Sequence, residues 1–145
     1  MIDVQAKIRE AYYTALNGQL TYDASPVPVV DDKLEDDQND TLYVVMSTQT
    51  AVDDSPFGKF DHETTMLLDI VYCPQDTVSK DVVDNVAQQI FNIILPTPET
   101  HGLTATGVQI TNVTVENDSY LSFVLSNSRS VMRRLIRFKQ LIHEL

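Results

Sequence analysis

The sequence has few of the residues that build disulfide frameworks, phosphate-binding loops or membrane spans. Cys73 is the only cysteine, which excludes an intrachain disulfide. The chain has four glycines and neither a Walker motif nor a GxGxxG motif, so we do not expect a glycine-rich loop around a phosphate. No stretch reaches eighteen apolar residues, and the charged start at residues 1–10 lacks the apolar segment of a secretory signal. We therefore expect a protein without a membrane segment.

Histidines are also too few and too dispersed to suggest a zinc motif. His62, His101 and His143 are far apart, and none has HxxxH or HExxH spacing. His62 falls on the inferred buried face of a strand, where a hydrogen-bonded core histidine is more common than a metal ligand. We therefore predict no catalytic residue, no metal site and no cofactor, and an enzyme is the weaker hypothesis.

Basic residues are scarce as well. Ten Lys and Arg stand against 21 Asp and Glu, which gives a formal net charge of −11. This balance argues against non-specific binding of nucleic acid, because such binding requires cationic side chains that neutralise phosphates. At 145 residues, of which 43% are hydrophobic, the chain can bury a core. We predict a single domain over residues 1–145.

What the sequence does contain is two charged segments of opposite sign. Residues 31–40, DDKLEDDQND, hold six carboxylates: Asp31, Asp32, Glu35, Asp36, Asp37 and Asp40. Half of the ten basic residues lie between positions 129 and 139: Arg129, Arg133, Arg134, Arg137 and Lys139. Opposite charges on one chain favour contacts between copies, and these eleven residues are the predicted interface. The alternative for the basic segment is internal pairing or a solvated strand face.

Two amphipathic helices are predicted from apolar residues that recur at three- and four-residue steps. The first covers residues 2–20, with Asp3 as its N-cap and Gly18 at a left-handed C-terminal position. The second covers residues 77–96, with Ser79 as its N-cap and a proline as its stop.

Alternating or β-branched stretches predict the strands. In residues 60–73 alternate positions are apolar, which indicates one buried and one wetter face. In residues 131–142 the side chains of Arg133, Arg137 and Lys139 share a face, although helical spacing remains an alternative there. Asn117 and Asp118 are expected to split the segment before it into two strands. The predicted strands are 26–30, 41–50, 60–73, 107–118, 120–126 and 131–142. The order of elements predicts an α+β fold, a mainly antiparallel sheet of about five to six strands with two helices on one face.

Seven stretches together carry a family resemblance. They are IDVQAKIREAYYTALNG at 2–18, PVPVVDDK at 26–33, TLYVVMSTQTAVDD at 41–54, KFDHETTMLLDIVYC at 59–73, VSKDVVDNVAQQIFNIILPTP at 78–98, GLTATGVQITNVTVEND at 102–118 and VMRRLIRFKQLIHEL at 131–145. Their order and content resemble the tail terminator, or tail completion, proteins of tailed bacteriophages, which include small head–tail joining proteins. The resemblance covers nearly the whole chain. It lies in the pattern of strands and helices, so it assigns no site residue.

The resemblance implies a structural role in the neck of a virion. Such proteins have an α+β fold and form rings, usually of six copies, that cap the tail tube and stop its polymerisation. The implied partners are other copies, the tail tube protein and the head-completion or connector protein. DNA passes through the ring without sequence-specific binding, and no reaction is catalysed. Assembly in the cytoplasm of a bacterial host is implied too.

The sequence is compatible with several alternatives. The acidic run at 31–40 either contacts a neighbour or partner ring, or is a solvated loop, or lines the channel and repels DNA phosphates. The function is either that of a tail terminator or that of another adaptor ring of the phage neck. A less favoured alternative is a stand-alone α+β domain that binds a ligand or catalyses a reaction.

Overall fold

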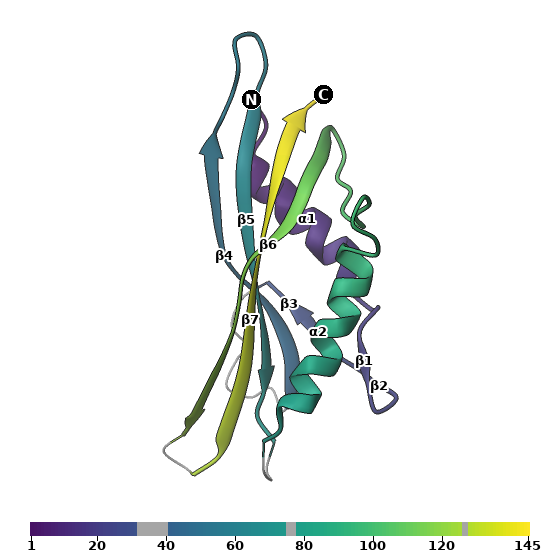
Figure 1. Cartoon of the computed structure of the whole chain (residues 1–145), viewed down its shortest axis with the longest axis vertical. Coiled ribbons are helices and arrows are strands. Elements are labelled where there is room, and N and C mark those ends of the chain that lie inside the picture. The colour runs from purple at the N-terminus through teal and green to yellow at the C-terminus, as the bar shows by residue number, and fades with distance from the viewer. Residues whose placement is uncertain (32–40, 75–77, 126–127) are drawn as a thin grey trace.

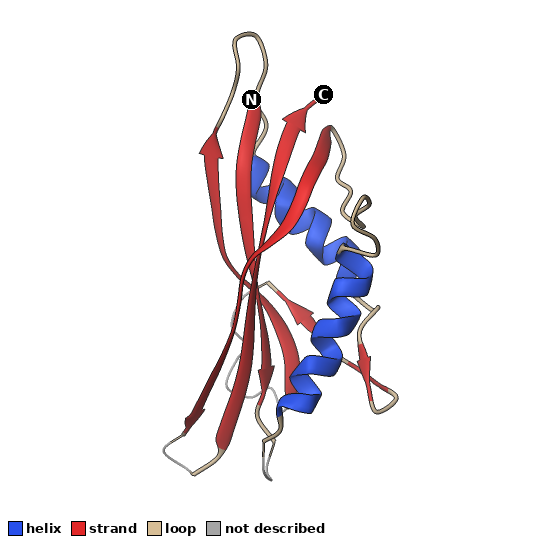
Figure 2. Cartoon of the chain, in the orientation of Figure 1, coloured by secondary structure: helices blue, strands red, loops and turns tan. Residues whose placement is uncertain are grey.

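The computed structural model confirms the predicted α+β class (Figure 1). It describes residues 1–31, 41–74, 78–125 and 128–145. A five-stranded sheet has the order β3-β4-β5-β7-β6, and β1 and β2 form a separate two-stranded sheet. Figure 2 shows that both helices cover the same face of the large sheet. Neither of the two described helices lies over the opposite face, which we call the open face.

The large sheet is antiparallel except at one edge. β3 pairs with β4 in parallel, and the pairs β4–β5, β5–β7 and β6–β7 are antiparallel. The strand bounds are Thr21–Tyr22 for β1, Ser25–Pro26 for β2, Val29–Val30 for β3, Leu42–Asp53 for β4, Asp61–Tyr72 for β5, Val108–Val124 for β6 and Ser130–Glu144 for β7. The prediction of an extended edge segment at 26–30 is therefore confirmed only for Val29–Val30, since Pro26 belongs to β2 of the small sheet.

Helix α1, Val4–Leu16, begins and ends as its sequence predicts. The Asp3 carboxylate accepts hydrogen bonds from the backbone N–H groups of Gln5 and Ala6, which have no partner inside the helix. Gly18 follows the C-cap with a φ of 76°, a backbone conformation that glycine adopts without strain. The buried face of α1 consists of Val4, Ile8, Ala11, Tyr12 and Leu16.

Helix α2, Lys80–Ile94, is also capped as predicted. Ser79 accepts a hydrogen bond from the backbone N–H of Asp81, and the helix ends just before Leu95 and Pro96. Apolar residues repeat with the helical period along α2, so they form one stripe that packs against the sheet. The buried residues are Val82, Val83, Val86, Ala87, Ile90 and Ile94.

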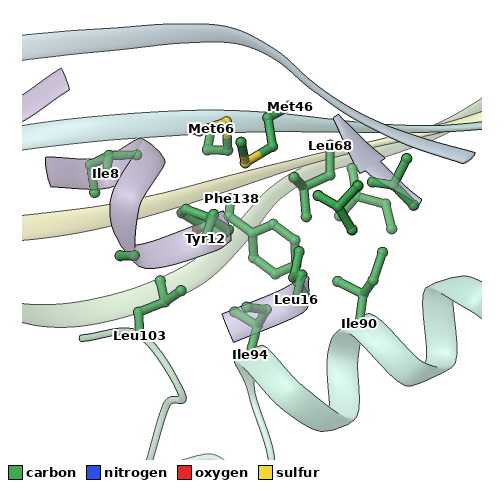
Figure 3. Close-up of a cluster of buried hydrophobic side chains, with 14 of the residues drawn as sticks. Ile8, Tyr12, Leu16, Met46, Met66, Leu68, Ile90, Ile94, Leu103 and Phe138 are labelled. Carbon is green, nitrogen blue, oxygen red and sulfur yellow. The ribbon is translucent and has the colours of Figure 1, made fainter. Parts of the chain in front are cut away.

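The core lies between the two helices and the sheet (Figure 3). Phe138 on β7 is its centre, because its ring centroid lies 5.9 Å from that of Tyr12 and 6.1 Å from that of Phe91. The buried hydroxyl of Tyr12 donates a hydrogen bond of 2.7 Å to Gln140 Oε1, and Gln140 Nε2 donates one of 2.7 Å to Thr64 Oγ1. Among the described residues, no buried side-chain polar atom lacks a partner.

The predicted break at Asn117 and Asp118 is wrong. β6 is one strand of 17 residues, and both positions pair with β7, Asn117 with Arg137 and Asp118 with Ile136. Register shifts between Thr111 and Thr114, and again just before Asn117, accommodate the irregular stretch. Continuous pairing with β7 overrides the turn preference of the Asn-Asp pair.

Residues 131–142 form a strand, so the helical alternative for this segment is excluded. β7 pairs with β5 on one side and with β6 on the other, which no helix can do. Its side chains alternate: Ile136 and Phe138 are buried against the helices, and Arg133 and Arg137 lie on the open face.

Candidate assembly surfaces

The predicted basic interface is divided between the two faces of the sheet. Arg133, Arg137 and Lys139 lie on the open face, as their alternation predicts, and each has a different environment. Arg134 points to the other face, beside α2. The five cations are therefore close in sequence but do not form one continuous surface.

Arg133 is committed to an ion pair within the chain. Its guanidinium binds the Asp69 carboxylate of the neighbouring strand β5, with Nε at 3.2 and 3.1 Å from the two oxygens and Nη2 on Oδ2. The side chain of Asp69 is 6% exposed and that of Arg133 is 30% exposed. The hydrogen bond from Arg133 to Asp69 is the main reason why the pKa of Arg133 is raised. A carboxylate this buried requires such a partner.

Arg134 joins α2 to β6 beneath the other face of the sheet. It binds Asp84 of α2 at 2.9 Å and Asp118 of β6 at 2.7 Å. Its guanidinium also lies over the rings of Tyr120 and Phe91, at 5.2 and 5.6 Å. The hydrogen bond to Asp118 is the main reason why the pKa of Arg134 is raised. Arg134 therefore acts as an internal brace.

Arg129 and Lys139 have internal partners as well. The Arg129 guanidinium donates to the backbone carbonyls of Cys73 and Pro74. Lys139 Nζ lies 2.9 Å from Glu63 Oε1 in an exposed pair, and its hydrogen bond to Glu63 raises the pKa of Lys139. Exposed pairs of this kind add little to stability. Both cations are satisfied without a second copy.

Arg137 differs from the other four cations. Within the described part of the chain it forms no ion pair, and its hydrogen bond to Thr48 Oγ1 is long at 3.5 Å. Since β7 pairs with β5 and β6 on both sides, Arg137 is held at the middle of the open face. Of the predicted cations, it is the one with neither an ion pair nor a short hydrogen bond to another described residue.

The predicted acidic interface is described at one position. Asp31 is exposed and directly follows β3. The other predicted acidic residues lie outside the described residues: Asp32, Glu35, Asp36, Asp37 and Asp40.

The open face contains a hollow that the sequence did not predict. We call it the open-face hollow; it has a volume of about 740 Å³ and is more apolar than polar. It lies where β4 and β7 begin and where β5 and β6 end, beside Arg133. The apolar side chains that line it are Tyr43, Val45, Met46, Val71, Phe123, Leu125 and Val131. The alternation in residues 60–73 predicted a wetter second face, but Asp69 and Val71 on that face are buried.

A second unpredicted feature is an exposed aromatic side chain in the loop between β4 and β5, which lies at the far end of the sheet (Figure 1). Phe57 in this loop is fully exposed, and Val52 and Phe60 in the same hairpin are 60% and 47% exposed. The segment before Phe57 has the composition of a turn, because Asp, Ser and Pro favour turns; its residues are Asp53, Asp54, Ser55 and Pro56. The one available indication of a surface role was a large apolar residue between Pro56 and Gly58.

The histidines are held by structural hydrogen bonds. His62 is buried, as predicted, and its Nε2 lies 3.5 Å from Glu144 Oε2. His143 Nδ1 lies 2.9 Å from Asp61, and His101 Nε2 lies 2.7 Å from the Ile110 carbonyl. In the described ranges no three His, Cys, Asp or Glu side chains are grouped to hold a metal ion. Neither described helix has the length and apolarity to cross a bilayer.

Comparison with known proteins gives a structural likeness only. No protein-family model and no curated protein sequence matches the chain. A chain from the virion of a native gene transfer agent particle is similar in structure, with a TM-score of 0.71 at 11% sequence identity. The match covers 99% of each chain. The two proteins therefore share a fold along their whole length.

Proposed function

We propose that this protein is a structural component of a virion that forms a ring at the head–tail junction, with six copies as the expected number. The ring caps the tail tube, stops its polymerisation and docks the head connector, and DNA passes through its centre. The protein acts by assembly and catalyses no reaction. It binds tail tube protein on one side and a connector or head-completion protein on the other, and is assembled in the cytoplasm of a bacterial host.

The observation that carries this proposal is the full-length structural likeness to a chain of a gene transfer agent virion. It agrees with the resemblance of the sequence to tail terminator proteins. The same likeness supports a location in the virion.

The charge of the chain fits a ring through which DNA slides. A net charge of −11 disfavours tight, non-specific binding of phosphates. The cations that would otherwise attract DNA are mostly occupied: Arg133 by Asp69, Arg134 by Asp84 and Asp118, and Lys139 by Glu63. A channel wall of this kind repels the duplex more than it binds it.

Particles that lack this protein test the proposal directly. We expect negative-stain images to show overlong tail tubes or separate heads and tails, and complementation with the wild-type chain to restore joined particles. Normal virions without the protein, or a labelled copy found in virions away from the junction of head and tail, contradict the proposal.

Arg137→Glu tests the charged part of the assembly surface. The substitution reverses a cation on the open face that forms no ion pair with any other residue the structure describes. We expect a folded chain that forms fewer oligomers by light scattering. Arg133→Glu is a poorer test, since it places two carboxylates together at Asp69 and destabilises the fold. Lys139→Gln, which removes an exposed pair with Glu63, is the matched control and should assemble normally.

A further inference from the structure

The loop between β4 and β5 is ordered, although its largest apolar side chain contacts water. The backbone N–H of Asp54 donates to the Asp61 carbonyl at 2.9 Å, and that of Lys59 donates to the Pro56 carbonyl at 3.2 Å. Ser55 Oγ accepts from the Asp61 N–H at 3.1 Å. The loop thus holds the exposed Phe57 in a defined place, at no gain to the fold of its own chain.

The open-face hollow offers a site for such a side chain. Its apolar wall includes Val45, Val71, Phe123 and Val131, which come from four different strands. A volume of about 740 Å³ lies within the range of clefts that enclose small ligands. One aromatic ring with its neighbouring residues fits into this space. Buried aromatic anchors of this type often dominate the energy of an interface.

Loop and hollow lie at opposite ends of the same strands. The 12 residues of β5 separate the loop from Cys73, which lines the hollow. At roughly 3.3 Å per residue this strand is about 40 Å long. Phe57 therefore cannot reach the hollow of its own chain. Two different patches on one chain give a head-to-tail contact, which closes into a ring when the rotation between copies permits it.

The charges beside the two patches are complementary at one point, although Asp31 also lines the hollow and Lys59 follows Phe57 in the loop. Asp53 at the end of β4 and Asp54 in the loop precede Phe57, and Ser55 donates hydrogen bonds to Asp53 that lower the pKa of this carboxyl. Arg137, without an ion-pair partner among the described residues, contacts Thr48 at the rim of the hollow. When the loop of one copy approaches the hollow of another, the carboxylate of Asp54 can bind the guanidinium of Arg137.

We propose that Phe57 of one copy inserts into the open-face hollow of the next copy, where Asp54 binds Arg137. The occupant of the hollow is thus a second copy of this chain. This inference rests on the proposed ring and deepens it, because it names the contact between neighbouring subunits.

The single native cysteine permits a direct test. Cys73 lines the hollow, so Phe57→Cys places a second thiol at the other half of the proposed contact. Under copper–phenanthroline the two thiols lose two protons and pass two electrons to two Cu(II) complexes, and the two sulfur atoms join as a disulfide. We expect covalent dimers and larger species on a non-reducing gel, and their loss on reduction. Since an intrachain bond cannot form over this distance, each such bond joins two copies.

Two control variants define the result. Phe57→Cys combined with Cys73→Ser should give no ladder, which excludes disulfides between two copies of residue 57. Glu99→Cys is exposed in the loop after α2, and should give no ladder with Cys73. A ladder that persists in the double variant, or that Glu99→Cys reproduces, contradicts the contact.

Phe57→Ser supplies an independent measurement by light scattering. We expect association at least tenfold weaker than that of the wild type, with an unchanged melting temperature, since Phe57 contributes no buried surface to its own chain. A wild-type oligomer that Phe57→Ser leaves intact overturns the contact and spares the ring. A wild-type chain that stays monomeric, both alone and on purified tail tubes, overturns the ring and the contact together.

Discussion

Arg133 and Asp69 form an ion pair across β5 and β7 in which the carboxylate is far more buried than the guanidinium. Removing one partner of such a pair leaves an uncompensated charge, whereas replacing both with apolar side chains can be nearly neutral. Since Arg133 is 30% exposed, water compensates part of the loss. The pair therefore stabilises the sheet less than a fully buried pair would.

We predict that Arg133→Met lowers the free energy of unfolding by about 2 kcal/mol. Adding Asp69→Leu should restore most of that loss, because the buried carboxylate is then gone. Urea denaturation of the four chains of this double-mutant cycle measures the coupling. Losses that simply add in the double variant refute a specific pair. Lys139→Met, which breaks the exposed pair with Glu63, is the matched control and should change stability by less than about 0.5 kcal/mol.

Gly102 is required where the chain leaves α2. A Cβ built at this position lies 2.1 Å from the Ile93 carbonyl oxygen, and the Gly102 N–H donates to the Ile94 carbonyl at 3.0 Å. We expect Gly102→Ala to lower the free energy of unfolding by about 2 kcal/mol, because backbone must move to relieve the clash. Thermal and urea unfolding measure the loss.

Gly58→Ala separates this clash from the general effect of adding a side chain. Gly58 has a φ of +84° and no heavy atom within 4 Å of the added Cβ, so only its backbone conformation opposes alanine. The expected loss is about 1 kcal/mol. Equal losses at the two positions would show that the contact with Ile93 has no effect of its own.

The elements of the fold were predictable because their signals are local. Asp3 and Ser79 cap helices by accepting hydrogen bonds from backbone amides two or three residues away. Both partners of each bond therefore lie in one short stretch of sequence. Alternation in β5 and β7 likewise follows from the geometry of a single strand. The continuous β6 was not predictable in this way. Pairing with β7, which follows in sequence, decides that Asn117 stays inside a strand.

The candidate surfaces were predictable only in part. Sequence alone located the cations of β7, but not their partners, since Asp69 and Asp84 lie 64 and 50 residues away from the arginines that bind them. Most of these cations form ion pairs within the chain, as the alternative hypothesis for the basic segment predicts. Phe57 and the open-face hollow were missed because exposure and concavity arise only from the folded sheet.

Arg134 should be sensitive to loss of its planar shape as well as its charge. Its guanidinium binds Asp84 and Asp118 at once and lies over the Tyr120 ring, which a lysine ammonium cannot reproduce. We predict that Arg134→Lys lowers the free energy of unfolding by about 1 kcal/mol, and that added salt reduces the difference from wild type. A lysine variant as stable as wild type at low salt would show that a single charge is sufficient there.

The buried phenol of Tyr12 should make the free energy of unfolding depend on pH in the alkaline range. Burial raises the pKa of the Tyr12 phenol well above its ordinary value, so the fold favours the neutral form. The unfolded chain loses this proton near pH 10. The stabilisation is therefore complete below about pH 10 and decreases as the pH rises further, until the folded protein also loses the proton.

We expect Tyr12→Phe to be less stable than wild type at pH 7 by about 1 kcal/mol, because Gln140 Oε1 loses its donor. Above pH 10 the difference should shrink, since phenylalanine has no proton to lose, while the other titrating groups are common to both chains. Urea unfolding from pH 7 to 11 measures this convergence. Tyr13→Phe, at the exposed neighbouring position, should follow the wild type throughout. A constant gap between Tyr12→Phe and wild type up to pH 11 would mean that the phenol ionises without opening the core.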